Sequence, residues 1–134
     1  MSKLSDVCQS VCQDVDGAVA VGVVDLSSGM MMGVYHTVPY FTQDYLDAVS
    51  AASVEMFRGK LVSRIEQLLS KQRGGEVKET FQEIFINSSH VYHFMKVIEE
   101  KNAVVIMVTK KTTNQGMGWS SLKMAIPDIK ALLP

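Results

Sequence analysis

Residues 42–73, TQDYLDAVSAASVEMFRGKLVSRIEQLLSKQR, carry the pattern that decides the fold. Apolar side chains recur there at three- and four-residue spacing, as on one side of an α-helix. The stripe changes sides halfway along. The first stripe comprises Tyr45, Val49, Ala52 and Met56. The second comprises Val54, Phe57, Leu61, Ile65 and Leu68. The sequence therefore predicts a long helix with two faces that need burial.

The ends of this helix are marked by ordinary capping residues. Pro39 closes the preceding extended segment, and Thr42 can accept hydrogen bonds from the first-turn amides. Gly74 and Gly75 follow the last turn. A helix of this length would run roughly 45 Å, against a radius of gyration of about 14 Å for such a domain. Either Gly59 breaks the helix, or its second face meets another molecule, and we favour the second molecule.

Composition indicates one domain over residues 1–134. The chain is 47% hydrophobic and carries 13 basic and 14 acidic side chains, a formal charge of −1. With so little net charge, the chain has no strong positive electrostatic potential to attract nucleic acid or an acidic membrane. No apolar run approaches the roughly 20 residues that span a bilayer, and the N-terminus turns polar too soon for a signal peptide. We expect a cytoplasmic protein without nucleic-acid binding or membrane insertion.

The two cysteines, Cys8 and Cys12, fall within one helical apolar stripe. Its members are Leu4, Val7, Cys8, Val11, Cys12 and Val15. We favour buried, reduced thiols over a redox or metal pair, because the chain has no further cysteine to complete a structural zinc site.

The remaining segments predict an α/β fold with five antiparallel strands and helices on both faces. A first short helix precedes a hairpin of two strands, and a meander of three strands follows the middle helix. The predicted strands cover residues 17–25, 30–36, 77–86, 90–98 and 103–109. The last helix is expected over residues 113–133, with Pro127 as a potential interruption.

Three segments together resemble the Roadblock family of dynein light chains and its prokaryotic relatives. They are residues 17–25 with their hairpin, the middle helix, and residues 112–123. In that family a strand with a Gly-Ala-Val-like start ends at an aspartate before a glycine-containing turn, and an Asn-x-Gly segment opens the last helix. The matching positions here are Asp25, Gly29, Asn114 and Gly116. Pro127 and the run of methionines at 30–32 depart from the pattern.

The resemblance implies a profilin-like sheet, with the long middle helix on one face and the N- and C-terminal helices on the other. It also implies a homodimer in which third strands meet edge to edge and middle helices pack together. This agrees with the two-faced helix. The expected dimer-interface residues are Val54, Phe57, Leu61, Ile65, Leu68, Phe81, Glu83 and Phe85. Family members generally have no chemistry of their own; they bind and regulate small Ras-like GTPases or attach cargo to motors.

A regulator that inserts an arginine into a GTPase site could draw on only three residues. These are Arg58, Arg64 and Arg73, all on the middle helix, although solvated helix surface is the ordinary role for each. The segment 114–118 could hold a phosphate at a helix N-terminus, but glycine permitting a tight turn is the favoured interpretation.

We expect no catalytic residue, metal site or cofactor. His90 and His93 point to opposite faces if they lie on one strand, and His36 stands alone. The alternative function is a profilin-like sensor or small-molecule-binding module, with methionines of the second strand walling a chamber. An enzyme ranks third, because nothing nominates a nucleophile or an acid–base pair.

Overall fold

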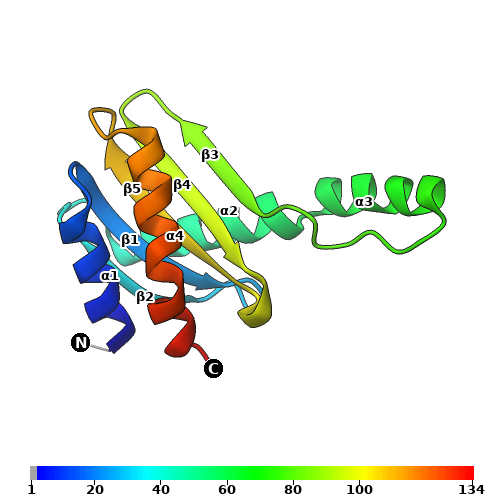
Figure 1. Ribbon diagram of the computed structural model, residues 1–134, viewed down its shortest axis with the longest axis horizontal. Helices are drawn as coiled ribbons and strands as arrows, with labels where there is room; N and C mark the ends of the chain where they lie inside the picture. The colour runs from blue at the N-terminus through cyan, green and yellow to red at the C-terminus, as the bar shows by residue number, and fades with distance from the viewer. Residues whose placement is uncertain (1–2) are drawn as a thin grey trace.

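A five-stranded antiparallel sheet lies between two helical layers in the computed structural model, which describes residues 3–134 (Figure 1). The strand order is β2-β1-β5-β4-β3, with β1 and β5 in the centre. The strands are β1 Ala18–Asp25, β2 Met31–His36, β3 Glu83–Asn87, β4 Val91–Ile98 and β5 Ala103–Lys110. The predicted α/β sheet is confirmed, and four strands begin and end within one residue of their predicted positions.

The helices cover the two faces as predicted. α1 (Lys3–Asp14) and α4 (Gln115–Ala131) lie on one face, and α2 (Gln43–Arg58) lies on the other (Figure 1). The short 3₁₀-helix η1 (Glu99–Lys101) joins β4 to β5. Pro127 does not interrupt α4, which continues through it. Within residues 3–134, no helix is long and apolar enough to cross a membrane.

Two hydrophobic cores result from the alternation of side chains along the central strands. Val21 and Val105 point to the α1/α4 side, where Cys8 and Cys12 are also buried. Burial raises the pKa of Cys8 to about 12, which keeps the thiol protonated at neutral pH. The interpretation of the cysteines as buried thiols is confirmed. The other core lies beneath α2 and contains the fully buried Phe57.

The single long helix predicted over residues 42–73 is wrong. Gly59 separates α2 from α3 (Lys60–Arg73) with extended backbone angles, φ −70° and ψ 173°. A Cβ atom at position 59 would lie 2.2 Å from the carbonyl oxygen of Glu55, so a side chain does not fit this joint. The break at Gly59, the interpretation that we did not favour, is the one the structure has. The part of the second stripe that lies on α3, Leu61, Ile65 and Leu68, nevertheless stays exposed.

The third strand is shorter than predicted, because residues 77–82 belong to a loop. Glu79 has a positive φ of 53°, which interrupts the extended backbone expected there. The amide and hydroxyl of Thr80 donate to the carboxylate of Glu66 on α3, at 2.7 and 2.6 Å. These contacts hold the segment against the helix, and the strand begins only at Glu83.

Candidate interaction surface

α3 and residues 74–82 form an arm that projects beyond the β3 edge of the sheet (Figure 1). The chain leaves the sheet face at Gly59, runs out along α3, turns at Gly74 in the left-handed conformation (φ 71°), and returns to β3. Apart from the returning loop, the main neighbour of α3 within the described chain is the end of α2. The arm therefore presents much of its surface to solvent.

The two halves of the arm are held together by partly buried polar contacts. The Ser70 hydroxyl accepts from the amide of Val77 at 2.7 Å and donates to the carbonyl of Glu66 at 2.9 Å. Glu66 is only 6% exposed, and its carboxylate receives both donors of Thr80. Burial alone would raise the pKa of Glu66, but the hydrogen bonds from Thr80 keep it below its ordinary value.

The arm should lose stability in acid because of Glu66. A carboxylate with a lowered folded-state pKa stabilises the fold above its unfolded pKa, near 4.3, and loses this effect as pH falls through the folded value. At pH 7, Glu66→Gln should lower the melting temperature by a few degrees. Below about pH 4 the difference from the unmodified protein should shrink. Thermal unfolding across pH 3–7 tests this, with the exposed Glu76→Gln as control; a pH-independent difference would contradict it.

The base of the arm is fixed to the sheet by Arg58. Its Nη2 donates to Oδ1 of Asn102 at 3.2 Å and lies 3.9 Å from a carboxylate oxygen of Glu79. The side chain is 16% exposed. Arg58 is thus a joint residue, whereas Arg64 and Arg73 are exposed along α3. Of the three predicted contact arginines, only these two are displayed to a partner.

An apolar stripe runs along α3 and is only partly covered by its own chain. It comprises Leu61, Ile65, Leu68 and Leu69, with exposed fractions of 79, 49, 52 and 37%. The spacing places them on one side of the helix. Sequence analysis identified the first three, but Leu69 was missed because it lies at the border of the stripe. A row of exposed leucine and isoleucine side chains is unusual on a monomer, so this stripe is the candidate interaction surface.

The other predicted interface residues differ in how exposed they are and in which face of the sheet they occupy. Phe57 is fully buried in the core beneath α2, so its assignment to a dimer interface is wrong. Val54 is half-buried against that same core. Phe85 packs against Phe94 on the opposite sheet face, with ring centroids 5.1 Å apart. Phe81, in the returning loop of the arm, is 36% exposed, and Glu83 is exposed at the start of β3.

β3 is an edge strand with an unpaired outer side in the described chain. The carbonyl of Gln82 accepts from the amide of Val97 at 2.9 Å. Because backbone groups alternate along an antiparallel strand, Ile84 and Ile86 bond to β4, and the amides and carbonyls of Glu83 and Phe85 point outward. The other sheet edge, β2, is partly occupied, since the Val34 amide donates to the Ser5 hydroxyl of α1. β3 is the edge better placed to accept another strand.

The residues that carried the Roadblock resemblance have structural roles. Asp25 accepts hydrogen bonds from the amides of Ser27 and Ser28 at 3.2 Å, which closes the turn that Gly29 completes with a φ of 75°. Asn114 caps α4 by accepting from the amide of Met117 at 3.0 Å. These contacts explain the motif through turn and helix geometry.

The segment 114–118 shows a packing requirement rather than a phosphate cradle. A Cβ atom on Gly118 would lie 2.7 Å from the ring of Phe94, so glycine lets α4 approach the sheet. The Lys111 amine donates to the carbonyl of Ser88. The structure supports the favoured interpretation of a tight strand-to-helix connection.

The histidines do not converge on a site. His93 faces the α2 side of the sheet, where burial lowers its pKa, while His90 is exposed in the turn before β4. His36 packs beside Phe41. Among residues 3–134 no group of three or more histidine, cysteine, aspartate or glutamate side chains is placed to hold a metal.

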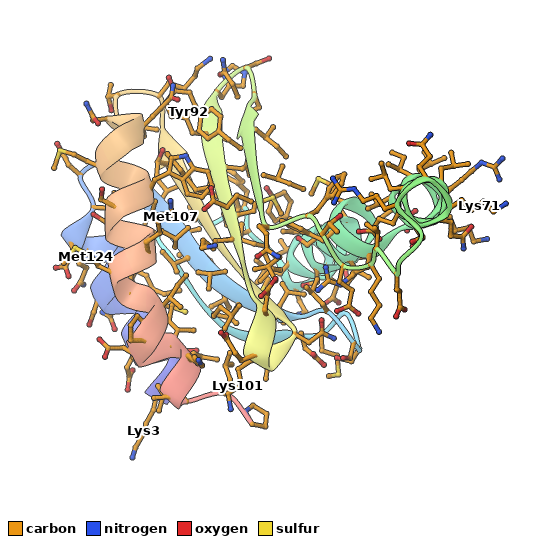
Figure 2. The ribbon with its side chains drawn as sticks, turned by 45° about the vertical axis from the view of Figure 1, so that its right-hand side comes forward. Lys3, Lys71, Tyr92, Lys101, Met107 and Met124 are labelled. Carbon is orange, nitrogen blue, oxygen red and sulfur yellow. The ribbon has the colours of Figure 1, made fainter. Side chains whose placement is uncertain are left out.

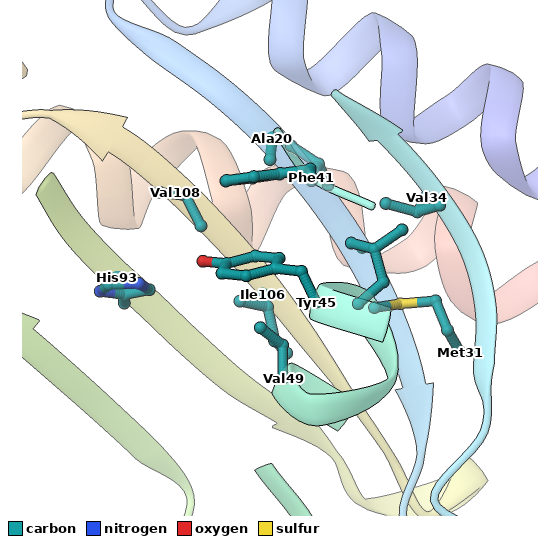
Figure 3. Close-up of a pocket in the computed structure, with 12 residues that line it drawn as sticks. Ala20, Met31, Val34, Phe41, Tyr45, Val49, His93, Ile106 and Val108 are labelled. Atoms are coloured by element: carbon teal, nitrogen blue, oxygen red, sulfur yellow. The ribbon is translucent and has the colours of Figure 1, made fainter. Parts of the chain in front are cut away.

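A small cavity between α2 and the sheet is the nearest equivalent of the chamber in the sensor alternative (Figure 3). Its volume is about 30 Å³, and Met31 is the only member of the methionine run among its lining residues. Phe41 and Tyr45 stack over it with centroids 4.5 Å apart. This volume suits one or two waters, so this cavity is too small to be the predicted methionine-walled chamber for a small molecule.

Comparisons with known proteins identify the fold. No protein-family model and no curated protein matches the sequence. MglB of Myxococcus xanthus superposes with a TM-score of 0.71 at 15% identity, covering 98% of this chain and 95% of that one. A Roadblock/LC7 domain from Streptomyces avermitilis gives 0.70 at 12% identity, covering 97% of each chain. A structure described as MglB with tetrameric arrangement gives 0.69 at 14%, covering 96% and 89%. The predicted resemblance is confirmed as a Roadblock/LC7 fold.

Proposed function

We propose that this protein is a homodimeric interaction platform, without chemistry of its own, that binds and regulates a small Ras-like GTPase. The observation that carries the proposal is the uncovered apolar stripe on α3, beside the open edge of β3. A stripe and an edge so placed suit a second copy of the chain. The GTPase partner is proposed by analogy with the Roadblock family, whose members generally bind and regulate such enzymes; the fold alone does not assign it.

In the proposed dimer, β3 strands of two copies pair antiparallel and continue the sheet. The outward backbone groups of Glu83 and Phe85 supply the hydrogen bonds. Because the arm extends past β3, a copy placed at this edge would lie beside α3 (Figure 1). Its apolar stripe could then be buried against the partner, which compensates for its exposure in the single chain. The tetrameric arrangement described for MglB supports self-association on this fold.

Solution mass measured by light scattering tests both parts of the proposal. The protein alone should have twice the chain mass of 14.8 kDa. Addition of small Ras-like GTPases from the same organism, loaded with GDP or a GTP analogue, should give a complex that depends on the nucleotide. A monomer indifferent to every GTPase would overturn the proposal. A dimer that binds none of them would support the homodimeric platform and contradict the proposed GTPase partner.

The exposed arginines of α3 provide a sharper test of regulation. If one of them enters the GTPase site, Arg64→Ala or Arg73→Ala should reduce stimulated hydrolysis by about 10³-fold or more, because an inserted arginine stabilises the transition-state charge. Both variants should retain the dimer mass. Arg58→Ala is the control for an arginine that holds the joint. Undiminished stimulation in both exposed variants would show that regulation acts through the GTPase's own switch loops.

A further inference from the structure

A groove between α1 and α4 lies on the sheet face opposite α2. The start of α1 and the end of α4 lie at the same end of this helical layer, so the two helices run in opposite directions (Figure 1). The groove has a volume of about 400 Å³. Its lining includes the apolar side chains of Val7, Val11, Met124 and Ala125. The remaining lining includes two serines and two aspartates, Asp14 and Asp128.

The charge of this groove is entirely acidic. The carboxylates of Asp14 and Asp128 make no ion pair or hydrogen bond with another residue among 3–134. The cations of α4 are engaged elsewhere: Lys123 lies 3.3 Å from Glu83, and Lys130 lies 3.5 Å from Glu100. The residues lining the groove therefore carry two carboxylates and no cation, on a chain whose total charge is only −1.

The groove also has an uncovered apolar wall. Met124, which lines the groove, is 80% exposed; Met117, two turns earlier on α4 and outside the lining, is 69% exposed. Figure 2 shows Met124 on the outer side of the helical layer. Exposed methionine is a flexible apolar group that adapts to the shape of a bound partner. The small serine and alanine side chains beside it leave room for another backbone to approach.

We propose that this groove binds an amphipathic helix of a partner protein, with an apolar stripe flanked by lysine or arginine. Two adjacent antiparallel helices offer a third helix a valley in which its apolar side chains can pack. From Val7 to Asp14 the groove follows two turns of α1, which matches anchors at i, i+4 and i+7. The carboxylates complement basic flanks, and they disfavour nucleic acid or a lipid phosphate by repulsion.

A designed peptide tests the chemistry of this groove directly. The probe is a fluorescein-labelled 16-residue helix with leucines at i, i+4 and i+7, lysines on both flanks and alanines elsewhere. Fluorescence anisotropy should show saturable binding, with NMR shifts confined to α1 and α4. Reversing both charges, Asp14→Lys with Asp128→Lys, should weaken binding about tenfold, since two attractions become repulsions. The double variant Asp44→Lys with Asp47→Lys, on the opposite face of the sheet, is the matched control.

Several outcomes would overturn the groove proposal. The proposal fails if the lysine peptide does not bind, or if a peptide with glutamate in place of lysine binds equally well. It also fails if the charge-reversed variant binds the lysine peptide with unchanged affinity. Ala125→Trp should fill the groove and abolish binding without changing any charge, so it provides a second test. A reduced solution mass in the charge-reversed variant would make a second copy of the chain the occupant instead. Failure of the proposed dimer can be distinguished from failure of peptide binding, because Leu61→Asp changes the α3 stripe and leaves this groove intact.

Discussion

Phe57→Ala should lower the free energy of unfolding by about 3–5 kcal/mol, among the largest stability changes expected for a single truncation in this chain. Phe57 is completely buried at the end of α2, where it fills the core between that helix and the sheet. Removing the ring leaves a cavity that neighbouring side chains can only partly fill. Because a domain of this kind has a total stability of about 5–15 kcal/mol, much of the margin would be lost.

Urea unfolding followed by circular dichroism measures this effect. Phe57→Leu, which retains most of the buried volume, should cost much less and serves as the matched control. Phe57→Asp should not fold, because it buries an unpaired charge. A full-stability Phe57→Ala variant that had lost only its dimer mass would return Phe57 to the interface and contradict the structure.

Leu61→Asp and Ile65→Asp should give folded monomers. Both side chains lie on the exposed stripe of α3, so their replacement removes nothing from either core. In a dimer that covers the stripe, each aspartate would be buried without a partner, at a cost of several kcal/mol. The dissociation constant should rise by at least 100-fold, which light scattering or analytical ultracentrifugation would register as a halved mass.

The matched control for this pair is Gln67→Asp, which introduces the same charge at an exposed position of α3 outside the stripe. It should retain the dimer. If all three variants kept the parent mass, the stripe would have no part in self-association. If all three lost it equally, net charge rather than stripe burial would be responsible.

Local patterns were sufficient to predict the sheet. The apolar runs in β1 and β5 are buried on both faces, and such runs have few alternatives to a central strand. Residues 77–82 were mispredicted because their alternation continues the pattern of β3. The contacts that remove them from the sheet come from Glu66 and Ser70, on a different element. A tertiary contact therefore overrode a local preference.

The interaction surface was predictable only in part. Leu61, Ile65 and Leu68 could be identified from helical spacing, but the same spacing placed Phe57 with them. The break at Gly59 explains the difference: Phe57 precedes it, on α2, whereas the other three residues follow it, on α3. The acidic groove left no signal in the sequence. Asp14 and Asp128 lie near opposite ends of the chain, and only the packing of α1 beside α4 brings them to one groove.

We expect the two sides of the joint at Gly59 to unfold as separate units of unequal stability. α2 is anchored by a core, whereas α3 has 14 residues, a length at which an isolated helix is only marginally stable in water. Amide hydrogens of the arm should therefore exchange through local opening long before the sheet unfolds. In the proposed dimer, folding of the arm and recognition of the partner become one thermodynamic event, so protein concentration sets how much of the population carries an ordered α3.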